Sequence, residues 1–352
     1  MERTLTTRLA AVAAAGFLGV SATACDSGEG GDGGNNDQSE ASDLKVGLAY
    51  DVGGRGDKSF NDSAYRGLQK VEEELGVEEV NDLEPSEGES DSDKVDRLSL
   101  MAEQGYDIVF GIGFAYAEPM KEVAPEYPDV NFAIVDEEVE GIDNLTSLVF
   151  ADEEAAFLAG AAAAYKSEED HIGFVGGVET PLIKKFEAGY TAGAEHVTPD
   201  IEVETSYISQ PPDMSGFQDP ALGRSTAKGQ LDKGADVLYH GAGAAGTGVL
   251  EAVVNADAKF VGTDSDQYEN ASEEQKPHVV TSALKGVDTA VFEFASSVAE
   301  GAAQSGVQRF DLADGGVDYA TSNTEEIADI EDDLDELKQQ IADGEIEVPT
   351  KP

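Results

Sequence analysis

The chain has 352 residues, which is enough for two domains of ordinary size. Its 22 basic and 73 acidic residues give a net charge of −51, and a surface of this sign repels nucleic acid and anionic substrates. Because 40% of the residues are hydrophobic, the chain is not a disordered acidic polymer, and the charge indicates a folded protein adapted to high salt.

Residues 1–24 are predicted to be a targeting segment. Arg3 and Arg8 accompany an apolar run, 9–20, that is too short to cross a bilayer. Small residues follow and then Cys25, the single cysteine, in an order that resembles the lipobox of bacterial lipoproteins, although Ala22 stands where leucine is usual. We expect Cys25 to be lipidated after cleavage, with an ordinary secretory peptide as the alternative.

Residues 25–43 are rich in Gly, Asp, Asn and Ser and are predicted to be a flexible linker between this anchor and a globular part. The expected location is therefore the cell membrane, with the globular part on the extracellular side. A single cysteine excludes an internal disulfide and a cysteine-based metal site.

The globular part opens with a strand, a loop and a helix. The apolar run 46–50 predicts the strand, and apolar residues at helical spacing over 64–75 predict the helix. The loop therefore lies at a helix N-terminus, where unpaired N–H groups favour a polar ligand. Carboxylates beside an aromatic face suit a flat ring with hydroxyl and amine donors better than a phosphate; a solvated turn with a core Phe is the alternative. The candidate binding residues of this loop are Asp51, Asp57, Phe60 and Asn61.

From residue 45 onward the chain contains two similar halves in the same order. The predicted strands 45–50, 107–111, 131–136 and 145–150 correspond to 171–176, 236–240, 259–264 and 279–284. Strands that alternate with helices predict an α/β fold of two lobes, each a parallel sheet flanked by helices. We assign residues 44–150 to lobe one and 151–301 to lobe two, and we expect a ligand cleft between the lobes, at the carboxyl ends of the strands.

The last segment, 302–352, is predicted to return to lobe one. Residues 310–322 are extended and Gly-rich, and Thr324 begins a helix with an apolar stripe. We expect this helix to pack on lobe one after a third crossover between the lobes. A short coiled-coil dimer helix is the alternative.

Several short motifs over 44–352 together resemble the basic membrane protein family of substrate-binding lipoproteins, whose characterised members bind purine nucleosides for ABC importers. The motifs are Asp57-Lys-Ser-Phe-Asn61, Phe217-x-Asp219-Pro220, Gly246-Thr-Gly248, Gly262-Thr-Asp-Ser-Asp-Gln267, Thr281-Ser-x-Leu-Lys285 and Gly344-x-Ile-x-Val-Pro349. The resemblance implies a type I periplasmic-binding-protein fold, no catalysis and no cofactor. It also implies a nucleoside ligand, ABC permease and ATPase partners, and a lipid anchor.

The resemblance also implies roles for single residues. Phe60 would stack on the base, and Asp136 would accept from a base amine or ring N–H. Asp264 and Lys285 would hydrogen-bond the ribose hydroxyls, with the lysine offsetting the carboxylate charge. The shell would be completed by Asp51, Asn61 and Gly246.

The family stacks the base between two aromatic rings, and the second ring is not evident in the loop 241–246. His240 and Phe217 are the two candidates. The ligand could therefore depart from a purine nucleoside, and a sugar or other polyol is an alternative. A surface receptor that signals ligand occupancy is a further alternative with the same fold.

Enzymatic interpretations have less support. The loop 241–246 matches GxGxxG, but it falls late in the second half, in an exported chain with acidic neighbours that disfavour a pyrophosphate. The four histidines, His171, His196, His240 and His278, show no metal-ligand spacing, so no metal site is expected. The pair Asp264 and Asp266 could suggest acid–base work, as in an exported nucleoside hydrolase, but ligand hydrogen bonding by one of them is the simpler interpretation.

Overall fold

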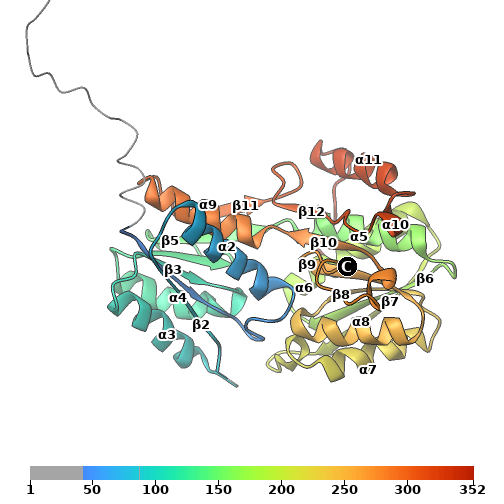
Figure 1. Ribbon diagram of the computed structural model, residues 1–352, viewed down its shortest axis with the longest axis horizontal. Helices are drawn as coiled ribbons and strands as arrows, with labels where there is room; N and C mark the ends of the chain where they lie inside the picture. Colours follow the sequence, from blue (N-terminus) through green and yellow to red (C-terminus); the bar gives the residue numbers. More distant parts are fainter. Residues whose placement is uncertain (1–42, 87) are drawn as a thin grey trace, which may run out of the picture. The chain divides into compact units, whose positions relative to one another are not determined.

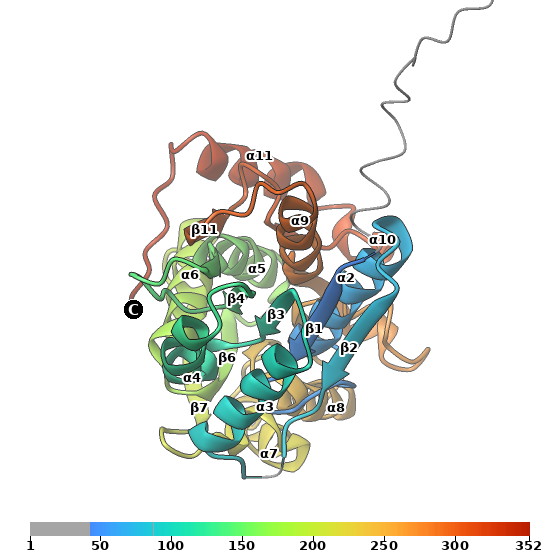
Figure 2. The ribbon, with the colours of Figure 1, turned by 90° about the vertical axis from the view of Figure 1, so that its left-hand side faces the viewer.

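The computed structural model describes residues 43–86 and 88–352 (Figures 1 and 2). The predicted targeting segment, Cys25 and the linker up to residue 42 lie outside the described residues. Within the described part of the chain, no helix combines the length and the apolar character needed to span a bilayer.

The first sheet has the strand order β11-β5-β4-β3-β1-β2, with every neighbouring pair parallel. Its strands are β1 (Lys45–Ala49), β2 (Glu79–Leu83), β3 (Ile108–Gly111), β4 (Asn131–Val135), β5 (Leu145–Phe150) and β11 (Gly306–Phe310). The strand order reverses between β1 and β3, and this is where ligands bind in open α/β sheets.

Helices cover both faces of the first sheet. On one face α2 (Phe60–Glu74) and α9 (Val287–Ala299) lie side by side (Figures 1 and 2). They approach closely because Gly67 has no side chain: a Cβ there would come within 2.7 Å of the Asp288 carbonyl oxygen. On the other face lie α3 (Asp91–Glu103) and α4 (Ala117–Val123).

The second sheet repeats the arrangement with the order β12-β10-β9-β8-β6-β7. Its strands are β6 (His171–Val178), β7 (Glu202–Ser209), β8 (Val237–Gly241), β9 (Lys259–Asp264), β10 (Val279–Lys285) and the short antiparallel β12 (Val317–Tyr319). Its helices are α5 (Asp152–Lys166) and α6 (Pro181–Val197) on one face, and α7 (Pro220–Leu231) and α8 (Gly246–Asn255) on the other. The predicted repeat is confirmed by the matching strand orders.

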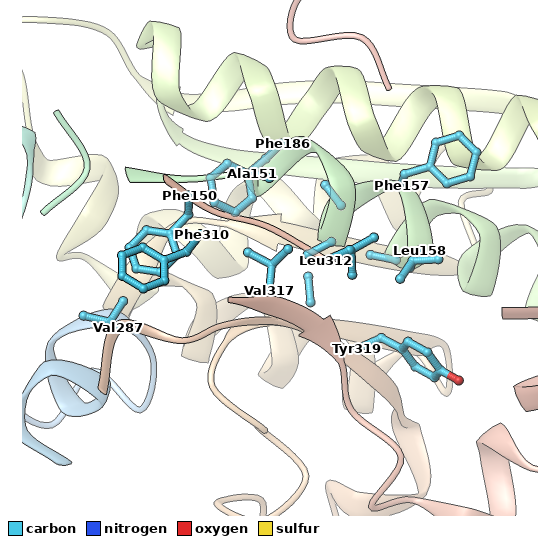
Figure 3. Close-up of a cluster of buried hydrophobic side chains, with 14 of the residues drawn as sticks. Phe150, Ala151, Phe157, Leu158, Phe186, Val287, Phe310, Leu312, Val317 and Tyr319 are labelled. Carbon is cyan, nitrogen blue, oxygen red and sulfur yellow. The ribbon is translucent and has the colours of Figure 1, made fainter. Parts of the chain in front are cut away.

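Three segments connect the lobes: β5 to α5, β10 to α9, and β11 to β12. Apolar side chains from all three pack together where they cross (Figure 3). Phe150 and Phe310 stack with ring centroids 5.2 Å apart, and Leu312, Val317 and Val287 belong to the same cluster. This apolar packing holds the three crossings side by side at the junction of the lobes.

The expected course of the C-terminal segment was wrong in part. A third crossover is present, but only β11 joins the first sheet. The terminal helices α10 (Thr324–Ile327) and α11 (Glu331–Ala342) pack on lobe two, where Lys166 Nζ lies 2.5 Å from Asp329 Oδ1 and Tyr319 Oη donates to Asp335 Oδ1 at 2.6 Å.

The boundary expected at 301 also differs from the structure. Helix α9 follows the last long strand of lobe two but packs on β3, β4 and α2 of lobe one. Conversely, α5 follows the strand β5 of lobe one and packs on lobe two. The two lobes therefore exchange the helices that follow their fifth strands.

Candidate functional site

A cleft between the carboxyl ends of the two sheets has, together with its opening to solvent, about 590 Å³ of empty space. Lobe one contributes residues that follow β1, β3 and β4, and lobe two contributes residues at or just beyond the carboxyl ends of β6 to β10. The cleft is lined by Asp51, Val52, Asp57, Phe60, Asn61, Gly113, Phe114, Asp136, Leu182, Ile183, Phe186, Phe217, Gly241, Gly243, Thr263, Asp264 and Lys285.

Asp57 organises the loop that enters α2. Its Oδ1 accepts from the backbone N–H groups of Ser59 and Asp62 at 2.9 and 3.1 Å, and its Oδ2 accepts from the backbone and side-chain nitrogens of Asn61 at 2.8 and 3.1 Å. These bonds satisfy helix N-terminal donors that would otherwise be unpaired. Burial raises the pKa of Asp57, and the donors oppose that shift. Asp57 lines the cleft, but both of its carboxylate oxygens already accept hydrogen bonds within the loop, and these bonds position Phe60 and Asn61.

Asn61 has an unused acceptor. The residue is buried, and its Oδ1 has no hydrogen-bond partner among the described residues, while its Nδ2 is held by Asp57. A buried carbonyl oxygen without a donor costs free energy. Because Asn61 lines the cleft, a ligand N–H or O–H could supply the missing donor.

Asp136 and Asp264 lie at the carboxyl ends of β4 and β9, and both are buried. Asp264 Oδ2 accepts from Ser59 Oγ of lobe one at 2.6 Å. Burial raises the pKa of Asp264 to about 6, although nearby Lys285 and the Ser59 hydroxyl oppose that rise. Burial also raises the pKa of Asp136, against the attraction of Lys285.

Lys285 is the buried cation of the cleft. Its Nζ lies 2.6 Å from Asp136 Oδ1 of lobe one and 3.0 Å from Asp152 Oδ1 at the start of α5. Burial alone lowers the pKa of Lys285, but Asp136, Asp152 and Asp264 outweigh it and raise the pKa overall. The ammonium therefore stays charged and joins the two lobes.

Aromatic rings surround this charged cluster. The Lys285 Nζ lies 5.2 Å from the ring centroid of Phe60 and 5.6 Å from that of Phe186. Across the cleft, Phe114 of lobe one and Phe217 of lobe two meet edge to face, with centroids 6.3 Å apart. Flat apolar surfaces thus lie next to acidic acceptors, and that combination suits a ring with hydroxyl and amine donors.

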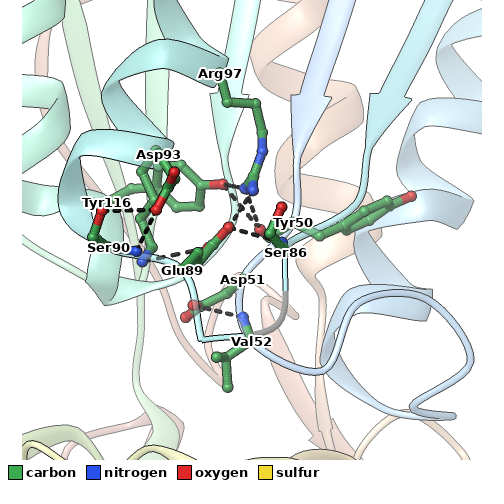
Figure 4. A network of polar contacts seen from close by, with 10 residues as sticks. Tyr50, Asp51, Val52, Ser86, Glu89, Ser90, Asp93, Arg97 and Tyr116 are labelled. Carbon is green, nitrogen blue, oxygen red and sulfur yellow. Dashed lines mark hydrogen bonds and ion pairs between the residues drawn. The ribbon is translucent and has the colours of Figure 1, made fainter.

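A polar network behind Asp51 holds the first loop in place (Figure 4). The Tyr50 carbonyl oxygen accepts from Tyr116 Oη at 2.9 Å and from Arg97 Nη1 at 3.3 Å, and Arg97 also pairs with the buried Glu89. Asp51 Oδ1 accepts from the Val52 N–H at 2.7 Å. Burial raises the pKa of Asp51 to about 6, against smaller opposing contributions from that N–H and from Lys94.

The structure brings together seven of the eight ligand residues expected from the sequence. The exception is Gly246, which begins α8 and lies under the His240 ring, where a Cβ would meet His240 Cε1 at 2.1 Å. His240 itself is fully buried, bonded to Gln267 at 3.1 Å, and does not line the cleft. Of the two candidates for a second ring, only Phe217 lines it.

Sequence reasoning assigned no ligand role to Phe114, Leu182, Ile183 or Phe186, all of which line the cleft, although it placed the segment 111–116 at the ligand-binding edge. Phe114 follows β3 in the segment Gly111-Ile-Gly-Phe114, at a strand end where ligand residues gather. The other three lie in the first turns of α6, and nothing in their helical spacing separates them from core residues.

Two parallel α/β lobes, joined by three crossings and facing each other over a lined cleft, define the class of two-lobed solute-binding proteins. A family model described as ABC transporter substrate-binding protein PnrA-like matches residues 44–351. The chain therefore belongs to this family, which consists of binding proteins and not of enzymes.

Individual proteins show the same relationship. The ABC transporter nucleoside-binding protein BmpA of Lactococcus lactis is 35% identical over 88% of this chain and 90% of its own length. A protein of Pyrococcus furiosus, named only as a lipoprotein, is 35% identical over 80% of this chain and 71% of its own. A solute-binding protein of an ABC transporter system from Aeropyrum pernix superposes with a TM-score of 0.75 at 30% identity, covering 87% of this chain and 93% of that one.

Proposed function

We propose that this chain captures a nucleoside, with a purine base, and delivers it to the permease of an ABC importer. The observation that carries the proposal is the composition of the cleft: phenylalanine rings from both lobes next to buried acceptors that lack enough donors of their own. A nucleoside supplies a flat ring that can stack on the phenylalanine rings, and hydroxyl and amine donors for the buried acceptors. The nucleoside-binding name of the Lactococcus relative supports the same assignment.

In this proposal the base stacks on Phe60, and Phe114 and Phe217 close the opposite side. Asp136 and the free Oδ1 of Asn61 accept from the polar edge of the base, and Asp51 completes that edge. The ribose hydroxyls donate to Asp264 while Lys285 donates to them. Charge-assisted bonds of this kind are among the stronger hydrogen bonds in proteins.

The charges of the cleft select against phosphorylated ligands. Asp51, Asp136, Asp152 and Asp264 are buried in or beside the cleft, and among the described residues that line the cleft Lys285 is the one cation. A phosphate would add negative charge to a region of low dielectric that already has an excess of it. We therefore expect nucleosides to bind and nucleotides with the same base to be rejected.

Delivery depends on closure of the lobes over the ligand. The bonds Lys285–Asp136 and Ser59–Asp264 both span the two lobes. A ligand held by Asp264 and Asp136 together makes its full set of contacts only when the lobes approach. It would therefore favour the closed arrangement that a permease recognises.

The test is a calorimetric titration of the chain from Asp43 onward in molar salt, after unfolding and refolding to remove any bound ligand. The panel is adenosine, guanosine, inosine, uridine, ribose and guanosine monophosphate. Micromolar or tighter binding of a purine nucleoside, with ribose and the nucleotide silent, is the expected result. Binding of ribose alone would identify a sugar-binding protein, and silence across the panel would remove the nucleoside from the proposal.

We further propose that Cys25 anchors the protein to the outer face of the cell membrane through a lipid. The lipoprotein name of the Pyrococcus relative and the lipobox-like segment before Cys25 support this. Membrane fractionation of cells that express the wild type and Cys25→Ser tests it. The wild type should sediment with membranes, and a serine variant that sediments equally would contradict the anchor.

A further inference from the structure

The amino ends of β6 and β7 bring together a histidine and two glutamates, at the edge of the second sheet opposite the cleft. His171 is paired in register with Glu202, and Gly173 with Glu204. Side chains of paired residues, and of residues two apart in one strand, share a sheet face. One ligand atom from each of His171, Glu202 and Glu204 lies within 4.8 Å of the other two.

His171 turns a buried nitrogen towards this group. The residue is 9% exposed, and its Nε2 is buried without a hydrogen-bond partner among residues 43–86 and 88–352. The Glu202 Oε1 lies 3.8 Å from this nitrogen, which is too far for a hydrogen bond. A buried imidazole nitrogen that faces carboxylates has the donor chemistry of a transition-metal ligand.

We propose that His171, Glu202 and Glu204 form a binding site for a divalent cation of the zinc type. Zinc bound at about 2.0–2.2 Å in a tetrahedral site holds its ligands about 3.4 Å apart. The His171–Glu202 distance of 3.8 Å is close to this, and the Glu202 side chain, 70% exposed, has room to adjust. Two carboxylates neutralise the ion, and water takes the fourth position.

A lysine competes with the ion. Lys233, just after α7, pairs with Glu204, and its side chain is 61% exposed. An ion pair with so exposed a lysine contributes little stability, so a divalent cation can displace the ammonium at small cost. The competition predicts that removing the charge of Lys233 strengthens metal binding.

The site is distinct from the nucleoside cleft. His171 begins β6, and the cleft lies beyond the carboxyl end of that strand, roughly 20 Å away at about 3.3 Å per residue. A bound ion would fasten β7, the outermost strand of the sheet, to β6 without touching the ligand. Its effect would appear in stability and not in nucleoside affinity.

The test is a Zn²⁺ titration of the full chain in molar KCl, which suppresses diffuse binding to the acidic surface. The variants are His171→Ala, Glu202→Gln and Lys233→Met. His278→Ala is the matched control, because the His278 ring already bonds the Ala258 carbonyl oxygen at 2.8 Å. Cys25 is present in every variant, so its own affinity for zinc cancels from the comparison.

The wild type should bind Zn²⁺ saturably and melt at a higher temperature when the ion is bound. Outer-shell changes already weaken metal sites roughly 10- to 100-fold, so His171→Ala and Glu202→Gln should weaken binding at least as much. Lys233→Met should tighten it, and His278→Ala should leave it unchanged. Equal affinity in all variants, or no saturable binding by the wild type, would overturn the proposal.

Discussion

Asp136 and Asp264 are equivalent residues of the two lobes, and both hold the backbone in the left-handed region, with φ of 71° and 63°. Each lies at the carboxyl end of the fourth strand of its half, β4 and β9, and lines the cleft. Asp and Asn tolerate this conformation better than most other residues. The repeat has thus placed one carboxylate from each lobe at the cleft in the same backbone geometry. Replacement by asparagine removes the carboxylate charge with the least backbone strain and is therefore the substitution of choice at both positions.

Replacing Asp264 with asparagine should weaken nucleoside binding by about 1.5–3 kcal/mol, the usual worth of hydrogen bonds to a charged group. Lys285 keeps Asp136 and Asp152 as partners in this variant, so the loss reports on the ligand and Ser59 contacts. Calorimetry measures the change. Asp266→Asn, two residues on and outside the cleft, is the control, and equal losses in both variants would contradict the site.

Phe60→Ala should cost about 1–3 kcal/mol of nucleoside affinity, the range found for bases stacked on aromatic side chains. Phe217→Ala should reduce affinity in the same direction, because it removes one of the two rings that meet across the cleft. Tyr165→Ala, at an exposed position on α5, is the control. Unchanged affinity in both Phe variants would show that the base does not lie among these rings.

Asp152→Asn should weaken nucleoside binding although Asp152 does not line the cleft. Asp152 lies at the start of α5, and its Oδ1 is 3.0 Å from Lys285 Nζ. Both residues belong to elements that pack in lobe two, so this pair persists when Asp136 moves away with lobe one. Losing a buried partner costs about 1–3 kcal/mol of stability.

The neighbouring Glu153→Gln provides the comparison, because Glu153 is equally buried but pairs with Arg309 at 2.8 Å. The Glu153→Gln variant should have a lower melting temperature but an unchanged affinity for the nucleoside. If the two variants show the same affinity, Asp152 contributes to folding only.

The stability of the unliganded protein should fall as the pH rises from about 4 to about 6. Burial raises the pKa of Asp51 and of Asp264 to about 6, above the unfolded value of about 3.9. Over this interval the folded state binds more protons than the unfolded state, so the free energy of unfolding decreases with pH. Asp264→Asn should flatten this part of the profile in urea unfolding; an unchanged slope would contradict the assignment.

Nucleoside binding should have the opposite pH dependence. A carboxylate that accepts from ligand hydroxyls must be ionised, so binding releases protons and weakens as the pH falls below about 6. Titrations at pH 6 in two buffers of different ionisation enthalpy measure the released protons. Asp264→Asn should release fewer, and an identical release would place the titrating group elsewhere.

The melting temperature should rise between low salt and molar KCl, because the net charge of −51 makes the folded chain repel itself until ions screen it. Glucose at the same osmolarity is the control for a general solute effect. A melting temperature that responds equally to both, or to neither, would refute the adaptation to high salt.

The sequence predicted the sheets and the first loop well, for reasons that the structure makes clear. Buried parallel strands are near-continuous apolar runs, so β1, β3, β4 and their equivalents stand out, and the repeat doubles the signal. The edge strands β2 and β7 were not predicted. Each is exposed along one side, and segments such as Glu79-Val-Asn-Asp-Leu83 have little apolar character.

Tertiary contacts account for the remaining errors. The apolar stripe of α11 shows that the helix is buried on one face, but not against which lobe, and the choice is decided by partners such as Asp318 for Lys338. Gly246 shows the same limit. The sequence shows a glycine at a helix start after a strand, but it does not show that the glycine is needed because the His240 ring packs directly against it.

The exchange of α5 and α9 between the lobes sets the order in which the molecule can be assembled during synthesis. Lobe one lacks a covering helix and its outermost strand until residues 287–310 have been made, by which time nearly all of lobe two is already available. The first half of the gene does not encode a complete lobe: a piece that ends at residue 150 lacks α9 and β11 and leaves part of one sheet face uncovered, whereas the piece from residue 151 onward contains all of lobe two. A chain crossing a membrane in extended form, amino end first, would therefore complete its first lobe only when its last fifth emerges.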